Sequence, residues 1–431
     1  MESTKENLIN NYLADQRPWV VAFSGGKDST LVLQLVYEML LDKRVKVRKP
    51  IYIISSDTLV EPPNISSYLS KTLELIKQNA QALNLAINVN IVTPSVEERF
   101  WSKIIGKGYP TPTWWFRWCT SYMKIRPSRR AIAQITRKHG SVILLLGTRY
   151  SESSSRLTKM KGRQYNERGL NPHNDIPNAL VFSPIENWKT DDVWEYLFKN
   201  NPPPWGGNHD FMLNLYRQAS GGECPIILNI NTPSCGGSRF GCWTCTVVKE
   251  DKAMKGFVET GEGWMEPLQD FRSWIKGIRE DPSMRMNKRR NKTIGQGPFT
   301  PEARKMILLR LLKTEKEVKV RLISDEEISY IQTIWSKEFD LEFSAYKISK
   351  KYGREVIGME NIEFSQEEQQ ILDSLVSKYE VSPELIYKLI ELVKIDYPNI
   401  DFHGAKAGLE RAIKETIELD IRQEELVQLS L

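Results

Sequence analysis

Apolar and polar residues follow two different periods in the first half of the chain. Short, nearly continuous apolar runs predict buried strands, and stretches with apolar residues three or four positions apart predict helices. The expected helices include residues 31–41 and 69–83. The expected strands cover residues 20–23, 51–54, 86–92 and 141–146, with a further short run at 181–182. Because strands alternate with helix-length segments, the pattern favours an α/β fold with a Rossmann-like parallel sheet.

The pattern changes on both sides of the last expected strand. Residues 159–178 are polar and rich in Gly, Asn and Pro, and they predict a mobile loop. Beyond residue 200, loop-like sequence holds most of the cysteines, and helical spacing then dominates at 264–280, 301–316, 325–351 and 366–378. We therefore predict an α/β domain over 1–200, a cysteine-bearing loop region over 201–280 and a mainly α region over 281–431.

Composition places the chain among ordinary globular proteins. Its 431 residues are 40% hydrophobic and 26% charged, close to the averages of soluble domains. The first residues, MESTKENLIN, are polar, and no apolar run approaches the roughly 18 residues of a membrane span. We therefore expect no signal peptide, no membrane association and a cytoplasmic location. The net charge of +6 is too small to identify a polyanionic partner.

The hexapeptide SGGKDS at residues 24–29 lies between the first expected strand and the first expected helix. Gly25 and Gly26 allow a tight turn and a close approach of the backbone to a ligand. The amides that follow point from a helix N-terminus, where anions bind, and Lys27 adds a positive charge. Asp28 would repel phosphate unless a Mg²⁺ ion lay between them. The loop therefore predicts a site for a magnesium-bound nucleotide.

Two further groups of polar residues follow expected strands. Asp57 comes after the second strand, and Gly147-Thr148-Arg149 comes after the fourth. Because the carboxyl ends of parallel strands meet at one edge of a sheet, we expect both groups to lie near the 24–29 loop. Arginines there would offset phosphate charge. Arg156 is a candidate for the same task, or else an ordinary surface charge.

Four of the five cysteines lie close together along the chain. Disulfides are rare in a reducing compartment, so metal ligation explains this cluster better. Four thiolates suit a tetrahedral zinc ion or a [4Fe–4S] cluster, and both alternatives stay open from the residues alone. The four candidate ligands are Cys224, Cys235, Cys242 and Cys245.

The fifth cysteine, Cys119, lies in an aromatic and basic segment. Lys124, Arg117 and Arg126 would favour its thiolate, so we hypothesise that Cys119 carries a persulfide and delivers sulfur. The alternative is a structural cysteine packed beneath tryptophans. A similar choice applies to the Trp-Trp-Phe sequence at 114–116, which could stack on a nucleobase, although core packing is the simpler expectation.

These motifs resemble a known family of nucleotide-using enzymes. SGGKDS resembles the SGGxDS loop of the ATP-pyrophosphatases, whose adenine nucleotide α-hydrolase fold is shared with phosphoadenosine-phosphosulfate (PAPS) reductases. GTRYSESSSR at 147–156 and WCTSYMK at 118–124 resemble segments of PAPS-reductase-like proteins. The resemblance implies catalytic roles for Cys119, Lys27, Asp28 and Arg149. It implies nucleotide contacts for Ser24, Gly25, Gly26, Lys27, Asp28, Ser29, Asp57, Gly147, Arg149 and Arg156, where Asp57 would contact nucleotide or Mg²⁺.

A narrower resemblance is to the DndC family, the sulfurtransferases of bacterial DNA phosphorothioation. It rests on PIENWKTDDVW at 184–194 and on SRFGCWTCTVVKEDKAM at 238–254, with ECP before it at 223–225. The family implies that ATP activates a non-bridging oxygen of a DNA phosphate, with release of pyrophosphate and AMP, and that a persulfide sulfur replaces this oxygen. A PAPS reductase or a tRNA thiolation enzyme is the alternative within the superfamily.

The DndC resemblance also implies cofactors and partners. The cofactors are ATP, Mg²⁺ and a [4Fe–4S] cluster on the four clustered cysteines, with structural Zn²⁺ as the alternative. The partners are DNA, a cysteine desulfurase as sulfur donor and other Dnd-system proteins. The basic segment at 285–292 either contacts DNA phosphates or is a solvated linker.

Overall fold

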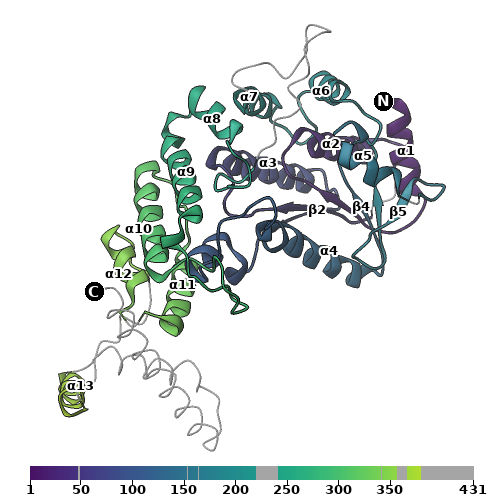
Figure 1. Cartoon of the computed structure of the whole chain (residues 1–431). Helices are drawn as coiled ribbons and strands as arrows, with labels where there is room; N and C mark the ends of the chain where they lie inside the picture. Colours follow the sequence, from purple (N-terminus) through teal and green to yellow (C-terminus); the bar gives the residue numbers. More distant parts are fainter. Residues whose placement is uncertain are drawn as a thin grey trace, which may run out of the picture. The chain divides into compact units, whose positions relative to one another are not determined.

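The computed structural model describes residues 1–46, 49–152, 154–163, 165–219, 241–340, 342–356 and 366–379. The chain forms two compact units (Figure 1). The first comprises Met1–Ser95 and Pro112–Arg272, and the second comprises Val96–Thr111 and the described residues from Ser273 onward. The division into three regions that the sequence suggests, 1–200, 201–280 and 281–431, stays a prediction. Among the described residues, none of the helices combines the length and apolarity that crossing a membrane requires.

A six-stranded sheet forms the centre of the first unit, in the order β3-β2-β1-β4-β6-β5. Every pair of neighbouring strands is parallel except β5 with β6. This arrangement confirms the expected α/β fold with a mainly parallel sheet. The strands are β1 (Trp19–Ala22), β2 (Ile51–Ser56), β3 (Ile87–Val92), β4 (Val142–Leu145), β5 (Leu170–Pro172) and β6 (Ala179–Phe182).

The edge strand β5 was not expected from the sequence. It falls within residues 159–178, for which a loop was predicted, and that prediction is wrong for this part. The strand is only three residues long, and its residue Asn171 pairs with Val181 of β6. Such a short strand carries no readable alternation of its own, because its structure comes from pairing with a neighbour.

Helices cover both faces of the sheet (Figure 1). Val21, Ile53 and Leu145 face one helical layer, whereas Val20 and Leu144 face α4. Because both faces are buried, the strands read as continuous apolar runs rather than alternating ones. The first layer contains α1 (Glu2–Leu13), α2 (Lys27–Leu41), α3 (Pro63–Ala82), α6 (Thr190–Lys199) and α7 (Asp210–Ala219), and the second contains α4 (Arg126–His139). The remaining helices of this unit are α5 (Ser154–Lys161) and α8 (Lys252–Glu259).

The strand order reverses between β1 and β4. From β1 the chain builds outward through β2 and β3, and it then returns to place β4 on the other side of β1. Trp19 of β1 is consequently in register with Ile51 on one side and Ile143 on the other. The crossover connections diverge at this point and leave a crevice at the carboxyl ends of the strands, where open α/β sheets bind ligands.

The second unit is helical, and the segment 96–111 belongs to it. Two indoles anchor the segment, since Trp101 Nε1 donates to Leu322 O at 2.8 Å and Trp335 Nε1 donates to Ile105 O at 2.8 Å. Arg304 Nε donates to the same Ile105 carbonyl at 2.9 Å. The described α-helices of this unit are α10 (Pro301–Val318), α11 (Asp325–Glu338), α12 (Ser344–Lys351) and α13 (Gln366–Tyr379), together with the second half of α9 (Glu266–Glu280), which begins in the first unit.

The sequence predicted one helix over 325–351, and the structure divides it into α11 and α12. The buried carboxylate of Asp340 causes the break, because it accepts from the Ser344 amide at 2.7 Å and from the Ser344 hydroxyl at 2.5 Å. A side chain that caps the start of the next helix in this way competes with helix continuation.

His209 should make the stability of the first unit depend on pH. Its side chain is 3% exposed, and Nε2 lies 2.8 Å from Gln34 Oε1 of α2. Burial, opposed by the charge of Asp210, lowers the pKa of His209 from 6.5 to about 4. The neutral ring therefore stabilises the native state above pH 6.5, and this stabilisation is lost as the pH falls through 4.

Because of His209, we expect the free energy of unfolding to be about 2–3 kcal/mol lower at pH 4.5 than at pH 7. Urea unfolding at the two pH values measures this difference. The variant His209→Asn should show a correspondingly smaller difference, and an unchanged one would contradict the role given to the histidine.

Candidate functional site

The 24–29 loop joins β1 to α2 at the point where the strand order reverses. Gly25 has φ +72°, a conformation that favours glycine, and a Cβ there would lie 3.1 Å from Leu69 Cδ1. Gly26 is the N-cap of α2, with φ −81° and ψ 157°. The first turn of the helix therefore directs its amides toward the crevice, as the SGGKDS sequence predicts.

Two hydroxyls brace this loop from inside. Ser24 Oγ and Ser29 Oγ lie 3.1 Å apart, and Ser29 Oγ also donates to Gly26 O at 2.9 Å. The Ser24 amide donates to Ser29 Oγ at 3.2 Å. These contacts close the turn on itself, so the serines give the loop a fixed shape as well as polar oxygens.

Asp28 holds two cations at once. Its Oδ2 lies 3.1 Å from Lys27 Nζ, and its Oδ1 accepts from Arg149 Nε at 2.7 Å. Arg149 is 1% exposed and also donates to Ser151 Oγ at 2.9 Å and Trp188 O at 3.1 Å. The structure thus gives the carboxylate a partner that the sequence did not suggest. Lys27 and Arg149 offset its charge, and a Mg²⁺ contact stays a prediction.

Gly147 lies where the end of β4 meets the first turn of α2. A Cβ on this residue would come within 2.8 Å of the Asp28 carbonyl carbon and oxygen. Real Cβ atoms do not come so close to backbone, so only glycine permits this approach. The glycine therefore lets Arg149 lie beneath the nucleotide loop, where it pairs with Asp28.

Tyr216 of α7 is a site residue that the sequence did not single out. Its hydroxyl accepts from the Lys27 amide at 3.3 Å, and Lys27 Nζ lies 5.4 Å from the centroid of its ring. Burial raises the pKa of Tyr216 well above its ordinary value, so the phenol stays neutral. In the sequence it is one aromatic residue on an amphipathic helix, and no local signal distinguishes it from core.

A cavity of about 520 Å³ lies against the loop, within the first unit. This volume is in the range of small-molecule sites. Residues 24 and 26–29 line one side, and Glu61, Lys124 and Gly241 also line it. Its apolar wall consists of Ile54, Ile65, Leu69, Ile132, Leu144 and Leu146, among others. The cavity thus combines an anion-binding loop with an apolar surface of the kind that a nucleobase needs.

Of the two acidic residues in the loop after β2, Glu61 lines this cavity and Asp57 does not. Asp57 Oδ1 accepts from the Leu59 amide at 2.8 Å and shapes the turn after β2. Glu61 accepts from the Thr58 hydroxyl at 2.6 Å and from the Thr58 amide at 3.1 Å. Burial raises the pKa of Glu61, although the nearby Lys124 opposes this. The contact of Asp57 with nucleotide or Mg²⁺ stays a prediction.

The Cys242-Trp-Thr-Cys245 sequence forms a tight turn beside the loop after β2. The Cys245 amide donates to Cys242 O at 2.9 Å, and the Trp243 amide donates to Val60 O at 3.1 Å. Arg272 Nε donates to Cys245 O at 2.7 Å and fixes the turn from behind. Both thiols are free, and burial raises the pKa of Cys242 to about 12.

Cys224 and Cys235 lie outside the described residues. Within the part of the chain that the structure describes, no group of three or more His, Cys, Asp or Glu side chains is arranged to hold a metal ion. The four-cysteine site therefore stays a prediction. Two of its members are placed together, in a turn held by main-chain hydrogen bonds.

Cys119 precedes a π-helical turn, Thr120–Ile125, and its thiol interacts electrostatically with those of the other two described cysteines. Burial and the charge of Cys245 raise the pKa of Cys119, and Lys124 only partly opposes them. The charge of Cys242, followed by Glu61, Cys119 and Cys245, raises the pKa of Lys124. Lys124 is therefore a cation that interacts with all three thiols, although Cys119 lies far from the Cys242–Cys245 turn in the sequence.

The arginines expected to activate Cys119 lie over aromatic rings instead. Arg117 lies 4.1 Å from the centroid of Trp114, and Arg126 lies 4.3 Å from that of Tyr122. Burial therefore decides the acidity of the thiol, and the prediction of a favoured thiolate is wrong for the state that the structure describes.

Arg156 lies in α5, and its side chain is outside the described residues.

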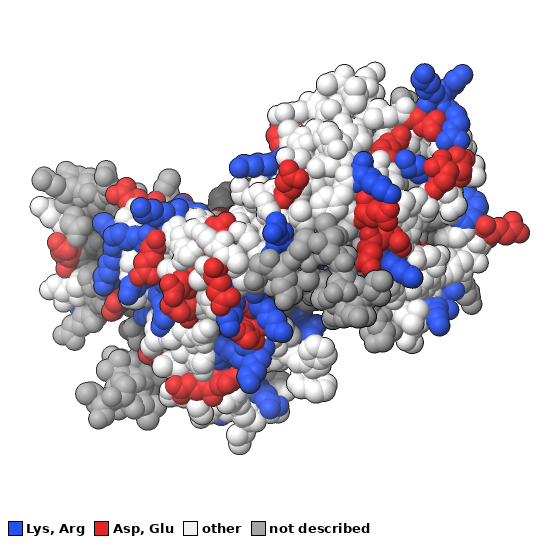
Figure 2. Space-filling model, turned by 90° about the horizontal axis from the view of Figure 1, so that it is seen from above, with Lys and Arg blue, Asp and Glu red and all other residues white. Residues whose placement is uncertain are grey.

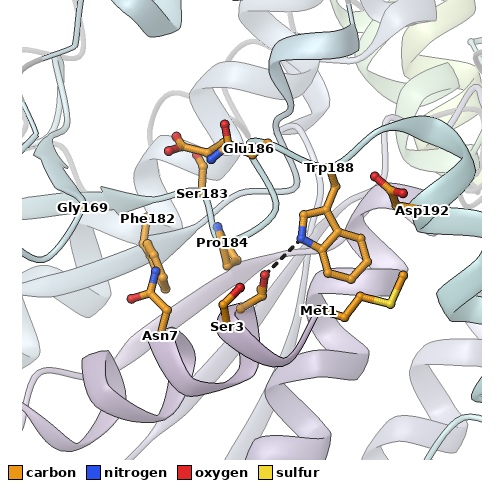
Figure 3. A pocket seen from close by; sticks show the side chains of 12 residues that line it. Met1, Ser3, Asn7, Gly169, Phe182, Ser183, Pro184, Glu186, Trp188 and Asp192 are labelled. Atoms are coloured by element: carbon orange, nitrogen blue, oxygen red, sulfur yellow. Dashed lines mark hydrogen bonds between the residues drawn. The ribbon is translucent and has the colours of Figure 1, made fainter.

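A second cavity, of about 550 Å³, opens after β6 beside α1 (Figure 3). Trp188 lines it and donates its indole N–H to Thr4 Oγ1 at 3.1 Å, the dashed line in the figure. None of the predicted site residues lines this second cavity.

Replacing Gly147 by alanine tests the close approach of β4 to α2. The added methyl group would press on the Asp28 backbone, shift the first turn of α2 and misplace Lys27. We expect Gly147→Ala to weaken ATP binding at least about tenfold and to destabilise the native state by roughly 1–3 kcal/mol. Calorimetric titration with ATP and Mg²⁺, together with thermal unfolding, measures both effects.

The matched control is Gly277→Ala in α9, where an added Cβ would meet no atom within 4 Å. It should bind ATP as the unchanged chain does. Equal affinities for the two variants would show that the contact between Gly147 and Asp28 does not shape the site.

The family model of the phosphoadenosine phosphosulfate reductase domain matches residues 18–248, more than half of the chain. An uncharacterised protein of Methanocaldococcus jannaschii is 25% identical over 279 residues, which are 62% of this chain and 46% of that protein. A second one from the same organism is 27% identical over 180 residues, 42% of this chain and 36% of that protein. The chain thus spans less than half the length of either relative.

Solved structures similar to the chain include FMN adenylyltransferase of Candida glabrata, with a TM-score of 0.31, 14% identity and coverage of 54% of this chain and 65% of that one. Another is the U34-tRNA thiolase NcsA of Methanococcus maripaludis with its [4Fe-4S] cluster. Its TM-score is 0.29 and its identity is 10%, and the match covers 65% of this chain and 78% of that one. The family match at residues 18–248 spans the SGGKDS loop, Cys119 and the Cys242–Cys245 turn. The chain belongs to the phosphoadenosine phosphosulfate reductase domain family.

Proposed function

We propose that the protein is an ATP-dependent sulfurtransferase of the DNA phosphorothioation type, similar to DndC. One observation carries this proposal: the nucleotide loop and the cysteine segments open onto the same cavity. Lys27 lines it from the loop, Lys124 from the segment after Cys119, and Gly241 from the residue before Cys242. An enzyme that activates an oxygen with ATP and then delivers sulfur needs both reagents within reach of one phosphorus atom.

The proposed reaction consists of two displacements. A non-bridging oxygen of a DNA phosphate attacks the α-phosphorus of ATP, and pyrophosphate leaves. The terminal sulfur of a Cys119 persulfide then attacks the adenylated DNA phosphorus, and AMP leaves with the original oxygen. A second thiol breaks the sulfur–sulfur bond, which releases the phosphorothioate and leaves a disulfide on Cys119 for cellular thiols to reduce.

The described residues divide this work among them. The amides at the start of α2 and Lys27 bind the phosphates of ATP and offset the charge that develops as pyrophosphate leaves. Asp28 and Arg149 act through Lys27, because their ion pair fixes the position of its ammonium group. Lys124 faces the thiols and offsets negative charge on sulfur when Cys119 reacts.

The proposal includes a metal site and partner proteins. Cys224, Cys235, Cys242 and Cys245 would hold a [4Fe–4S] cluster, or else structural Zn²⁺, and the free thiols of the Cys242–Cys245 turn are compatible with either. When bound, an iron–sulfur cluster supplies a one-electron redox couple. A cysteine desulfurase as sulfur donor, other Dnd-system proteins and Mg²⁺ with the ATP belong to the same proposal.

Replacing Cys119 by serine tests the sulfur-carrying step. We expect Cys119→Ser to lower phosphorothioate formation by roughly a thousandfold or more, because serine cannot carry a persulfide. The variant should still bind ATP, whereas Lys27→Ala should lose nucleotide affinity. Mass spectrometry of digested DNA, after incubation with ATP, Mg²⁺, cysteine and a cysteine desulfurase, detects the product.

The same digest applied to tRNA separates the alternatives. If tRNA contained thiolated nucleosides and DNA stayed unmodified, the substrate would be tRNA rather than DNA. Consumption of PAPS with release of sulfite, and without cleavage of ATP, would instead make the protein a PAPS reductase. If Cys119→Ser formed phosphorothioate as the unchanged chain does, Cys119 would not be the residue that carries the sulfur as a persulfide.

A further inference from the structure

The chain contains a long stretch without acidic residues, part of which lies beside the candidate site. No Asp or Glu occurs from Arg99 to Ser151, although Asp and Glu make up 54 of the 431 residues. Within the first unit, residues 112–151 carry eight Lys and Arg. On the face drawn in Figure 2, by contrast, positive and negative residues are interspersed. A local run of one sign identifies a polyanion site better than the net charge of the chain does.

Three large aromatic side chains of this stretch are exposed. Trp115 is 92% exposed, Trp114 is 66% exposed and Phe116 is 45% exposed. The expectation that they pack in the core is wrong, and only their neighbour Trp118, at 5% exposed, fits it. Leaving adjacent indoles in water costs free energy that burial would recover, so exposed aromatic clusters mark binding surfaces.

The aromatic turn is held in place at its base. The Thr113 amide donates to Phe116 O at 3.3 Å, and the Phe116 amide donates to Thr113 O at 3.2 Å. Thr246 Oγ1, next to the Cys242–Cys245 turn, donates to Pro112 O at 2.8 Å. The indoles therefore project from a braced turn, and little conformational entropy is lost when a ligand stacks on them.

Cations alternate with aromatic rings along this segment of the chain. Arg117 stacks on Trp114, and Arg126 stacks on Tyr122, with guanidinium carbons 4.1 and 4.3 Å from the ring centroids. Arg129 and Arg130 on the first turns of α4 are also exposed, and Arg129 NH2 donates to Asp175 O at 2.7 Å. Arginines between exposed rings are the combination with which proteins hold unpaired nucleic acid, phosphates on the cations and bases on the rings.

We propose that residues 114–130 form an aromatic–basic strip that binds a single strand of nucleic acid, with unpaired bases stacked on Trp114 and Trp115. The inference rests on the proposed function and makes its substrate more specific: the phosphate that reacts belongs to a strand that is locally unpaired. A paired duplex keeps its base faces stacked and cannot offer them to an indole. Trp115 and Cys119 are four residues apart, so their Cα atoms lie at most about 14 Å from each other.

Binding of fluorescein-labelled oligonucleotides to the full chain, followed by fluorescence anisotropy, tests this proposal. The probes are a 12-nucleotide DNA strand, the same strand as RNA, and the corresponding DNA duplex. We expect the single strand to bind more tightly than the duplex, and Trp115→Ala to weaken its binding about 5- to 100-fold. Trp115→Phe should restore most of the affinity, because it restores a ring.

Two further variants separate stacking from charge and from general effects. Arg117→Ala should lower the slope of log affinity against log salt concentration by about one, whereas Trp115→Ala should leave this slope unchanged. Trp264 is also exposed, at 40%, and lies in the same unit, so Trp264→Ala is the matched control and should bind all probes as the unchanged chain does. Circular dichroism confirms that each variant is folded.

The outcomes distinguish this inference from the proposed function. Equal binding of duplex and single strand, with no effect of Trp115→Ala, would overturn the strip. A chain that binds ATP and Mg²⁺ in calorimetry but none of the three probes would also overturn it, and would leave the nucleotide site standing. Preference for the RNA strand would support the strip and count against DNA as the substrate. Loss of a protein partner by Trp115→Ala, with unchanged oligonucleotide affinity, would make it a protein-binding surface instead.

Discussion

The contact between the end of β4 and the first turn of α2 is the constraint on which the site depends. Gly147 allows the two backbones to touch, and Arg149, two residues later, then reaches beneath the loop to Asp28. A buried ion pair of this kind adds little net stability, but removing one partner leaves a charge without compensation. The pair therefore fixes where Lys27 lies more than it holds the unit together.

Local patterns were sufficient to predict five of the six strands and the turn at residues 24–29. The buried strands are continuous apolar runs, and SGGKDS combines a left-handed glycine with a helix start, so each could be recognised within a few residues. The positions of Tyr216 and Glu61 at the cavity could not be recognised, because they depend on how α7 and the loop after β2 fold against the rest of the first unit. The same holds for the segment 96–111, whose place in the helical unit follows from contacts of Trp101 and Trp335 with distant carbonyls.

Charge and exposure were the hardest properties to predict. Counting cations around Cys119 suggested a thiolate, yet Arg117 and Arg126 lie over rings and burial raises the pKa of the thiol. The composition of residues 114–116 suggested a core, yet two indoles lie in solvent. In both cases the residue types were known and the direction in which each side chain points was not. That direction follows from the backbone of the braced turn and of the π-helical segment, which the sequence pattern does not specify.

The Cys242–Cys245 turn contacts two segments of the first unit that are far apart in the sequence. Through Trp243 it is bonded to Val60 in the loop after β2, and through Thr246 it is bonded to Pro112 at the base of the aromatic turn. A change in the ligation or oxidation of these cysteines that moves the turn would therefore move both the loop after β2 and the base of the aromatic turn. The turn therefore links the proposed metal site to the proposed strand-binding surface through hydrogen bonds of the chain itself.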